Sequence, residues 1–368
     1  MDDENRDDSE AASIEEALKL LEGADTTLAD RALGALEVAF ASNTIRRDSL
    51  RRCRTLINAP ADPMQLVASQ PADLSRLSLA VGTPSSDGSC VLGHDGYVFL
   101  TEGSNYVLSR YDREKASSED LAERWCALFD ERATRQRNAG RLYLQFVVPE
   151  KISVLPELLP FPLRTPTDLL SLIEAHFRSD NWKGKSVPVL DLFRIGGART
   201  FARLDSHQSG FGSYLVADYV ANLFGYRGLY GLPFTHTAIR SGDLAYRFFG
   251  TPLYEQSIEP NFTDYPILIV DPAPTEVYNP PSGGHLNSRY VWQNRDAPIK
   301  MRVVVFGNSC FERGGFPLIS WWFARLFEEF HFVWSNIVDD SYAEKVRADL
   351  VVGQTMERFL FVADVPGA

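Results

Sequence analysis

The sequence predicts an α/β protein whose mainly parallel sheet is covered by helices on both faces. In the last third of the chain, apolar runs of strand length alternate with stretches of helix length, which is typical of such a sheet. A length of 368 residues suggests a larger α/β domain with an appendage. Hydrophobic residues at 45% and charged residues at 23% are ordinary values for a soluble globular protein.

The predicted elements begin with a hairpin. Asp95-Gly96 has turn chemistry and precedes the β-formers Tyr97, Val98 and Phe99. Apolar runs bounded by Gly, Pro or charged residues then predict strands at 141–149, 186–192, 200–204, 266–270, 301–307, 331–335 and 349–353. Amphipathic spacing predicts helices at 118–138, 165–177, 210–225, 316–330, 341–348 and 355–361.

The N-terminal part differs from the rest in character. Residues 1–12 are acidic and polar, and we expect them to be disordered. Residues 13–85 are predicted to form a small helical appendage and a Pro-rich linker. Ser13 and Glu16 have the spacing of a capping box at the start of a first helix, and Gly23 can end this helix. We expect the helices to pack against the rest of the protein or to dock a protein partner. Residues 86–368 are then expected to form the catalytic domain.

The bulk composition excludes several classes. A net charge of −12 argues against a nucleic-acid partner, since neutralising phosphates needs a basic surface. No run approaches 18 apolar residues, so no membrane span is predicted. The N-terminus shows no apolar signal region, so we expect a cytoplasmic protein, or a periplasmic one if the N-terminus has been trimmed. Four widely spaced cysteines predict free thiols, and neither a cofactor nor a metal is expected.

A candidate nucleophile follows the clearest strand. In VVVFGNSC the apolar run ends at Gly307, which permits a sharp turn, and Asn308, Ser309 and Cys310 follow. Ligands bind outside the carboxyl ends of parallel strands, where a serine can face the cleft and its own amide can stabilise an oxyanion. The motif is short and occurs in many ordinary turns, so it is only suggestive by itself.

A candidate base lies about a hundred residues upstream. In TFARLDSHQSG, Asp205 and His207 stand two apart, after a strand-like run and before a helix. His207 has the chemistry of a general base for a hydroxyl nucleophile, and Asp205 can fix its tautomer. The alternative is an Asx-type turn that caps the helix from Gly210 and leaves His207 exposed.

Taken together, these motifs resemble the alginate O-acetyltransferase type of SGNH-hydrolase-like proteins, in which a D-x-H motif precedes the catalytic serine. The similarity covers roughly residues 88–362. It is carried in order by GHDGYVFL, LYLQFVVPEKISVLPELLP, TFARLDSHQSGFGSY, VVVFGNS and DLVVGQTMERFL.

The resemblance implies a three-layer SGNH-like domain and a triad of Asp205, His207 and Ser309. It implies a bacterial polysaccharide-modifying enzyme that transfers an acyl group, usually acetyl, from a donor to a sugar hydroxyl through an acyl-serine. Gly307 belongs to the turn, the Ser309 amide is the preferred oxyanion donor, and Asn308 is a further candidate.

Several alternatives stay open at the level of sequence. Cys310 is a rival nucleophile, although the family places the nucleophile directly after Gly-x. Gln208 stands where the family usually has tryptophan, and Asn308 stands where esterase relatives have aspartate. An esterase on the same triad, or a non-catalytic glycan-binding or scaffold protein, therefore remains an alternative to the transferase.

Other polar residues receive a plainer interpretation. Arg313 is a candidate to hold an anionic donor or substrate, with a solvated loop charge as its alternative. The remaining histidines show no metal-binding spacing and are expected to be structural or exposed: His94, His176, His236, His285 and His331.

Overall fold

A computed structural model describes residues 79–361, except 103–105, 113–114, 250–253, 263–264, 282 and 313. The expected disorder of residues 1–12, the predicted N-terminal helices and Arg313 therefore lie outside the described residues. The described residues fall into two compact units. The first holds residues up to 99, 203–205 and 237–258, and the second holds 100–202, 206–236 and 259 onward.

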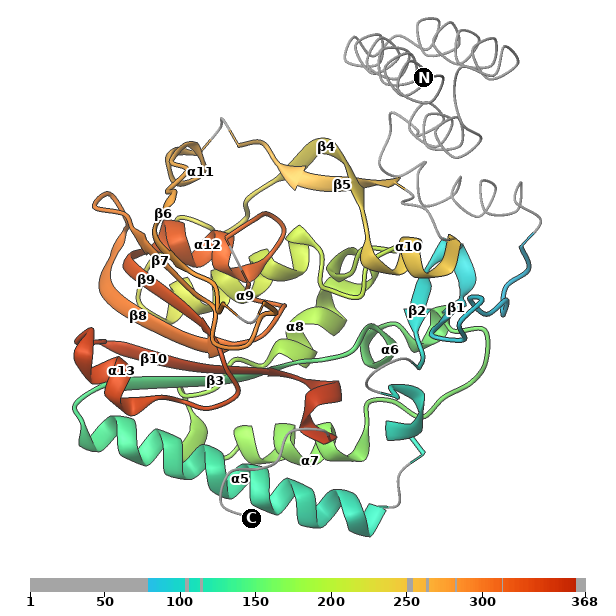
Figure 1. The fold of residues 1–368 in the computed structure, drawn as a ribbon, viewed down its shortest axis with the longest axis horizontal. Helices are drawn as coiled ribbons and strands as arrows, with labels where there is room; N and C mark the ends of the chain where they lie inside the picture. The colour runs from blue at the N-terminus through green and yellow to red at the C-terminus, as the bar shows by residue number, and fades with distance from the viewer. Residues whose placement is uncertain are drawn as a thin grey trace, which may run out of the picture. The chain divides into compact units, whose positions relative to one another are not determined.

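The second unit is built on a six-stranded sheet (Figure 1). Its order is β3 (Leu142–Val148), β10 (Leu350–Met356), β8 (Ile299–Gly307), β9 (Phe327–Trp334), β7 (Arg289–Gln293) and β6 (Pro274–Tyr278). The first four strands are parallel, and β7 and β6 continue the sheet antiparallel. The predicted mixed α/β architecture with a mostly parallel sheet is confirmed.

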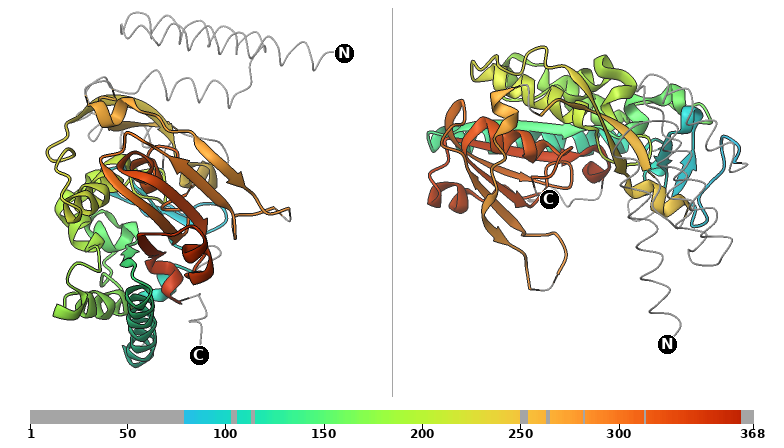
Figure 2. Two further views of the ribbon diagram at one scale, coloured as in Figure 1. Left: turned by 90° about the vertical axis from the view of Figure 1, so that its left-hand side faces the viewer. Right: turned by 90° about the horizontal axis from the view of Figure 1, so that it is seen from above.

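Helices cover this sheet on both faces (Figures 1 and 2). On one face lie α5 (Lys115–Asn138) and α7 (Asp168–Phe177), with α5 against β3. On the other lie α8 (Val189–Gly196), α9 (Gly210–Leu223) and α12 (Ile319–Leu326), with α12 against β9. Val303, Val304 and Val305 of β8 are fully buried. A strand that is covered on both faces has to be apolar at successive positions, which explains this run of valines.

Short elements connect these layers. They are the helices α6 (Lys151–Val154), α11 (Pro266–Ile269) and α13 (Asp340–Lys345), and the 3-10 turns η2 (Leu108–Arg110), η3 (Pro156–Leu158), η4 (Asp180–Trp182), η5 (Gly197–Thr200) and η6 (Glu357–Phe361). Within the described residues, no helix is long and apolar enough to cross a membrane.

The first unit contains the predicted hairpin. Its strands β1 (Cys90–Leu92) and β2 (Val98–Leu100) flank η1 (His94–Gly96), where Asp95 and Gly96 adopt the left-handed conformation with φ of 53° and 75°. A two-stranded sheet of β4 (Phe234–Ser241) and β5 (Tyr254–Pro260) lies largely in this unit, together with α10 (Asp243–Phe249). The hairpin prediction is confirmed.

Several predicted elements are wrong in type. Residues 186–192 do not form a strand, because Val189, Leu190 and Phe193 make one buried face of α8. Residues 266–270 contain the short helix α11, which begins at Pro266, a favourable first helical position. Residues 200–204 form no strand beyond one bridge from Phe201 to Gln208. Short apolar runs do not distinguish strands from buried helices by periodicity alone.

Two boundaries near the C-terminus are also wrong. The helix predicted at 316–330 ends at Leu326, and Phe327 begins β9. Phe327 and Phe330 are fully buried there, and β9 pairs in parallel with β8, so sheet formation outweighs helix propensity. Residues 355–361 were predicted as a helix, but Met356 still belongs to β10 and only a 3-10 turn follows.

Glu174 on α7 predicts a pH-dependent stability. Its side chain is buried, Oε1 has no hydrogen-bond partner among the described residues, and burial raises its pKa to about 7. As pH rises from about 4.5 to 7, the unfolded chain ionises Glu174 while the folded protein holds it neutral, so stability is lost. We expect Glu174→Gln to stabilise the protein at pH 8 by about 1–3 kcal/mol and to change little at pH 4.

Urea denaturation at both pH values measures this difference. Asp168→Asn, on the first residue of the same helix, is the control, because Asp168 forms an ion pair with the exposed Arg164. An equal effect of Glu174→Gln at pH 4 and pH 8 would contradict the prediction.

Candidate active site

The candidate nucleophile Ser309 lies on a tight turn at the carboxyl end of β8. The turn is closed by Phe311 and Glu312, whose amides donate to the carbonyl of Asn308 at 3.0 and 3.3 Å. A Cβ at Gly307 would lie 2.6 Å from Oε1 of Gln354, so a larger residue there would displace this side chain. Ser309 is half-buried on this turn, at the edge of the sheet where ligands of parallel α/β folds bind.

Asn308 is locked inside the turn by Gln354. Its backbone amide donates to Gln354 Oε1 at 2.9 Å, and its Oδ1 accepts from Gln354 Nε2 at 3.1 Å and from the amide of Cys310 at 3.3 Å. The side chain is 1% exposed, and Nδ2 has no hydrogen-bond partner among the described residues. An unused N–H donor therefore lies one residue from Ser309.

The hydroxyl of Ser309 contacts a sulfur atom. Its Oγ lies 3.9 Å from Sδ of Met356, which is a weak acceptor and holds the hydroxyl loosely. Nη2 of Arg358 lies 3.8 Å from the same sulfur, and the guanidinium forms a buried ion pair with Glu150 at 2.7 Å. Glu357, the residue before Arg358, is also buried, and burial raises the pKa of its carboxyl group.

The rival nucleophile Cys310 points into the core. Its side chain is fully buried, whereas Ser309 is half-buried one residue earlier. A nucleophile has to reach its substrate, so the difference in exposure favours Ser309. Cys310 fits the plainer interpretation of a small buried residue.

The stretch that leads to Asp205 is fixed within the first unit. Glu255, which is buried, accepts from the amides of Arg203 and Leu204 at 3.0 and 2.8 Å. The carbonyl of Leu204 accepts from the amides of Leu244 and Ala245, which lie at the start of α10. A Cβ at Gly242 would overlap this carbonyl, so Gly242 is required for the close approach. The backbone entering Asp205 is therefore held on two sides.

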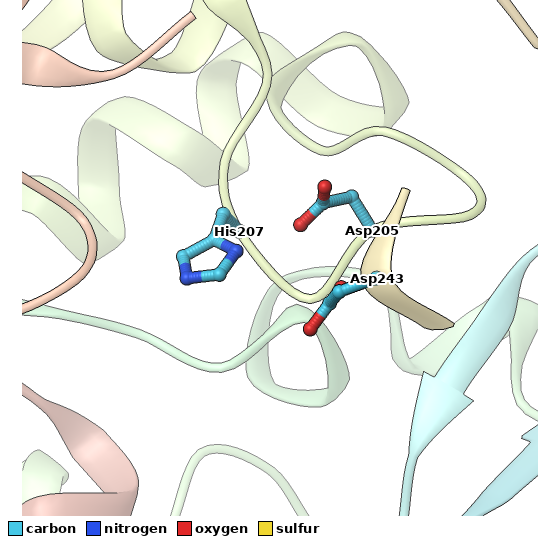
Figure 3. Close-up of side chains that lie close together, drawn as sticks. All are labelled: Asp205, His207 and Asp243. Carbon is cyan, nitrogen blue, oxygen red and sulfur yellow. The ribbon is translucent and has the colours of Figure 1, made fainter. Parts of the chain in front are cut away.

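Asp205 and His207 lie side by side, and Asp243 joins them (Figure 3). The three side chains each offer one ligand atom within 4.8 Å of the others. One imidazole and two carboxylates could hold a metal ion, but polar groups of this kind often gather without one. Asp243 is not among the residues predicted from the sequence, because only the fold brings it to Asp205 and His207.

Gln208 connects the two candidate segments directly within the second unit. Its Nε2 donates to the carbonyl of Cys310 at 2.8 Å and to Oγ of Ser213 at 3.1 Å. The residue after His207 is thus bonded to the residue after Ser309. A second contact lies nearby, where a Cβ at Gly210 would overlap the ring of Phe316. These contacts hold the segment of the candidate base His207 against the turn of the candidate nucleophile Ser309, whose hydroxyl contacts Met356.

Comparison with known proteins gives structural likeness only. No protein-family model matches the chain, and no curated protein matches it. Similar solved structures include Bacillus cereus PatB1 with a sulfonyl adduct, with TM-score 0.49, 11% identity and coverage of 75% of this chain and 96% of that one. The O-acetyltransferase domain of Pseudomonas putida AlgJ has a TM-score of 0.44 and 16% identity, and the match covers 75% of this chain and 93% of that one. A DHHW family protein from Eubacterium siraeum has a TM-score of 0.43 and 13% identity, with coverage of 75% of this chain and 92% of that one. At such identities the likeness says nothing about activity.

The hydrogen bond of Gln208 predicts a measurable role. Gln208→Leu removes two buried hydrogen bonds, to the carbonyl of Cys310 and to Oγ of Ser213, although the carbonyl keeps the amide of Ile319 as a donor at 3.2 Å. At about 0.5–1.5 kcal/mol for each bond, we expect a loss of about 1–3 kcal/mol in the free energy of unfolding. Gln293→Leu is the control, because Gln293 is exposed at the end of β7 and its loss should stay within about 0.5 kcal/mol. Urea denaturation of both variants measures this, and equal losses would contradict the role given to Gln208.

Proposed function

We propose that the chain is a serine-dependent O-acyltransferase that moves an acyl group, acetyl in the first instance, to a sugar hydroxyl. The observation that carries the proposal is the hydrogen bond from Gln208 to the carbonyl of Cys310. It joins the D-x-H segment to the G-N-S turn, and the order of these motifs is that of the alginate O-acetyltransferase type. The half-buried position of Ser309 at the carboxyl edge of the sheet supports it further.

In the first half-reaction, Ser309 Oγ attacks the carbonyl carbon of the acyl donor and His207 takes the hydroxyl proton. The tetrahedral intermediate collapses, the bond to the leaving group breaks, and His207 returns the proton to that group. Asp205 orients the imidazole and stabilises its charged form. The enzyme is left with an acyl-serine.

In the second half-reaction, a sugar hydroxyl attacks the acyl-serine. His207 takes the proton of this hydroxyl and returns it to Ser309 Oγ, so the serine is regenerated and the sugar ester leaves. The backbone amide of Ser309 is the first candidate donor to the oxyanion, and Asn308 Nδ2 is the second because it has no other partner among the described residues. With water in place of the sugar, the same residues give an esterase.

A serine-directed acylating probe tests the nucleophile and its base. We expect the probe to label Ser309, and His207→Ala to slow labelling by about 10²–10⁴-fold because the hydroxyl loses its base. Mass spectrometry of peptides locates the label. Ser309→Ala is the negative control, and Cys310→Ala should retain labelling. A label on Cys310, or none on the folded protein, would sink the serine mechanism.

Transfer and hydrolysis are separated by their products. Release of acetate from a small acetyl ester is measured with and without an added oligosaccharide. A transferase forms acetylated oligosaccharide at the expense of acetate, whereas an esterase forms acetate alone. An unlabelled Ser309 together with neither product would favour the non-catalytic glycan-binding alternative.

A further inference from the structure

An aromatic step stands beside the Ser309 turn, on the same edge of the sheet. We use "aromatic step" for Trp334, the last residue of β9, and His285, whose ring stacks on the indole at a centroid distance of 4.6 Å and an angle of 26°. Trp334 is half-buried and the side chain of His285 is 52% exposed. Unlike the stacked Trp292 and Phe330, which are both at most 2% exposed, this pair reaches solvent.

Backbone hydrogen bonds hold the two residues of the aromatic step in place. The amide of Trp334 donates to the carbonyl of Ser288 at 2.9 Å, and the amide of Asn287 donates to the carbonyl of Trp334 at 2.8 Å. Asn287 adopts the left-handed conformation, and Ser288 closes the turn by donating to the carbonyl of His285. The turn that carries His285 is therefore fastened to the end of β9, which holds the imidazole over the indole.

The aromatic step and the Ser309 turn are joined by contacts on two sides. Gly307 is the register partner of Trp334, and the amide of Ser335 donates to the carbonyl of Gly307 at 3.0 Å. From the other side, Glu312 closes the Ser309 turn and its carboxylate contacts Nδ1 of His285 at 3.2 Å. A ligand group on the step is thus held next to the turn that carries Ser309.

We propose that the aromatic step is the acceptor subsite and takes a neutral hexopyranose unit of a glycan; this rests on the function proposed above. Aromatic rings offer a flat apolar face to the C–H face of a pyranose, and a few polar groups at its rim fix the orientation. The carboxylate of Glu312 stands at this rim and repels a carboxylated sugar. The subsite therefore discriminates against uronates.

Binding is measured first without chemistry, on Ser309→Ala protein. Titration with neutral tetrasaccharides, cellotetraose and mannotetraose, is followed by tryptophan fluorescence, and tetragalacturonate is the anionic counterpart. We expect at least one neutral sugar to bind and to quench fluorescence, and tetragalacturonate to bind more weakly. In the same background, His285→Ala and Trp334→Leu should weaken binding by about tenfold, since each removes part of the stacking surface. Tyr230→Ala, at a tyrosine that is 79% exposed elsewhere, should change nothing.

The charge selection is tested by Glu312→Gln, which should reduce the preference for neutral over uronate sugars. In the active protein, His285→Ala should raise the KM for the acceptor more than it lowers kcat. Binding that is equal in Ser309→Ala protein with and without His285→Ala or Trp334→Leu overturns the subsite, and so does an unchanged preference in Glu312→Gln. If Ser309 is labelled by the acylating probe while these results fail, the subsite is wrong and the acyl-serine mechanism stands; if Ser309 is not labelled, the mechanism itself fails.

Discussion

The hydrogen bond from Gln208 to the carbonyl of Cys310 is the interaction on which the candidate site depends. Two loops far apart in sequence can act together only if they are fixed to each other, and this bond fixes them one residue away from His207 and Ser309. Both of its ends are buried, so water does not compete for it. The overlap that any Cβ at Gly210 would make with Phe316 shows that the same two segments also pack without room for a side chain.

The sheet supplies the rigid base beneath this bond. Gln354 on β10 reaches across to Asn308, so the turn after β8 is held by its neighbouring strand. Past the end of β10, Glu357 accepts from the amides of Glu150 and Thr167, and Arg358 pairs with Glu150. Buried charges stay in a fold only when they are paired and hydrogen-bonded. These contacts fasten the loops that follow β3 and β10 at the same edge where Ser309 lies.

The sequence predicts the parts of this architecture that depend on long, strongly patterned segments. The strand before Gly307, the helix from Gly210 and the hairpin turn at Asp95-Gly96 follow from apolar runs, capping and turn chemistry. The strand predicted at 186–192 is wrong, because a short apolar run does not reveal whether it packs as a strand or as a helix such as α8. Asp243 and the stack of His285 on Trp334 depend on contacts between distant segments, which no local pattern contains.

Two buried polar atoms near the Ser309 turn have no hydrogen-bond partner among the described residues. They are Oε1 of Gln208 and Nδ2 of Asn308, and both residues bond to Cys310 through their other amide atom. Leaving such a group unpaired costs about 1–3 kcal/mol, and a fold selected for stability alone would replace it. The orientation of each amide is set by the bond that holds the loops together. The unused donor and acceptor therefore belong to the two side chains that hold Cys310, the residue after Ser309. Buried polar atoms without partners are found more often at functional sites than elsewhere, which agrees with the function proposed for this turn.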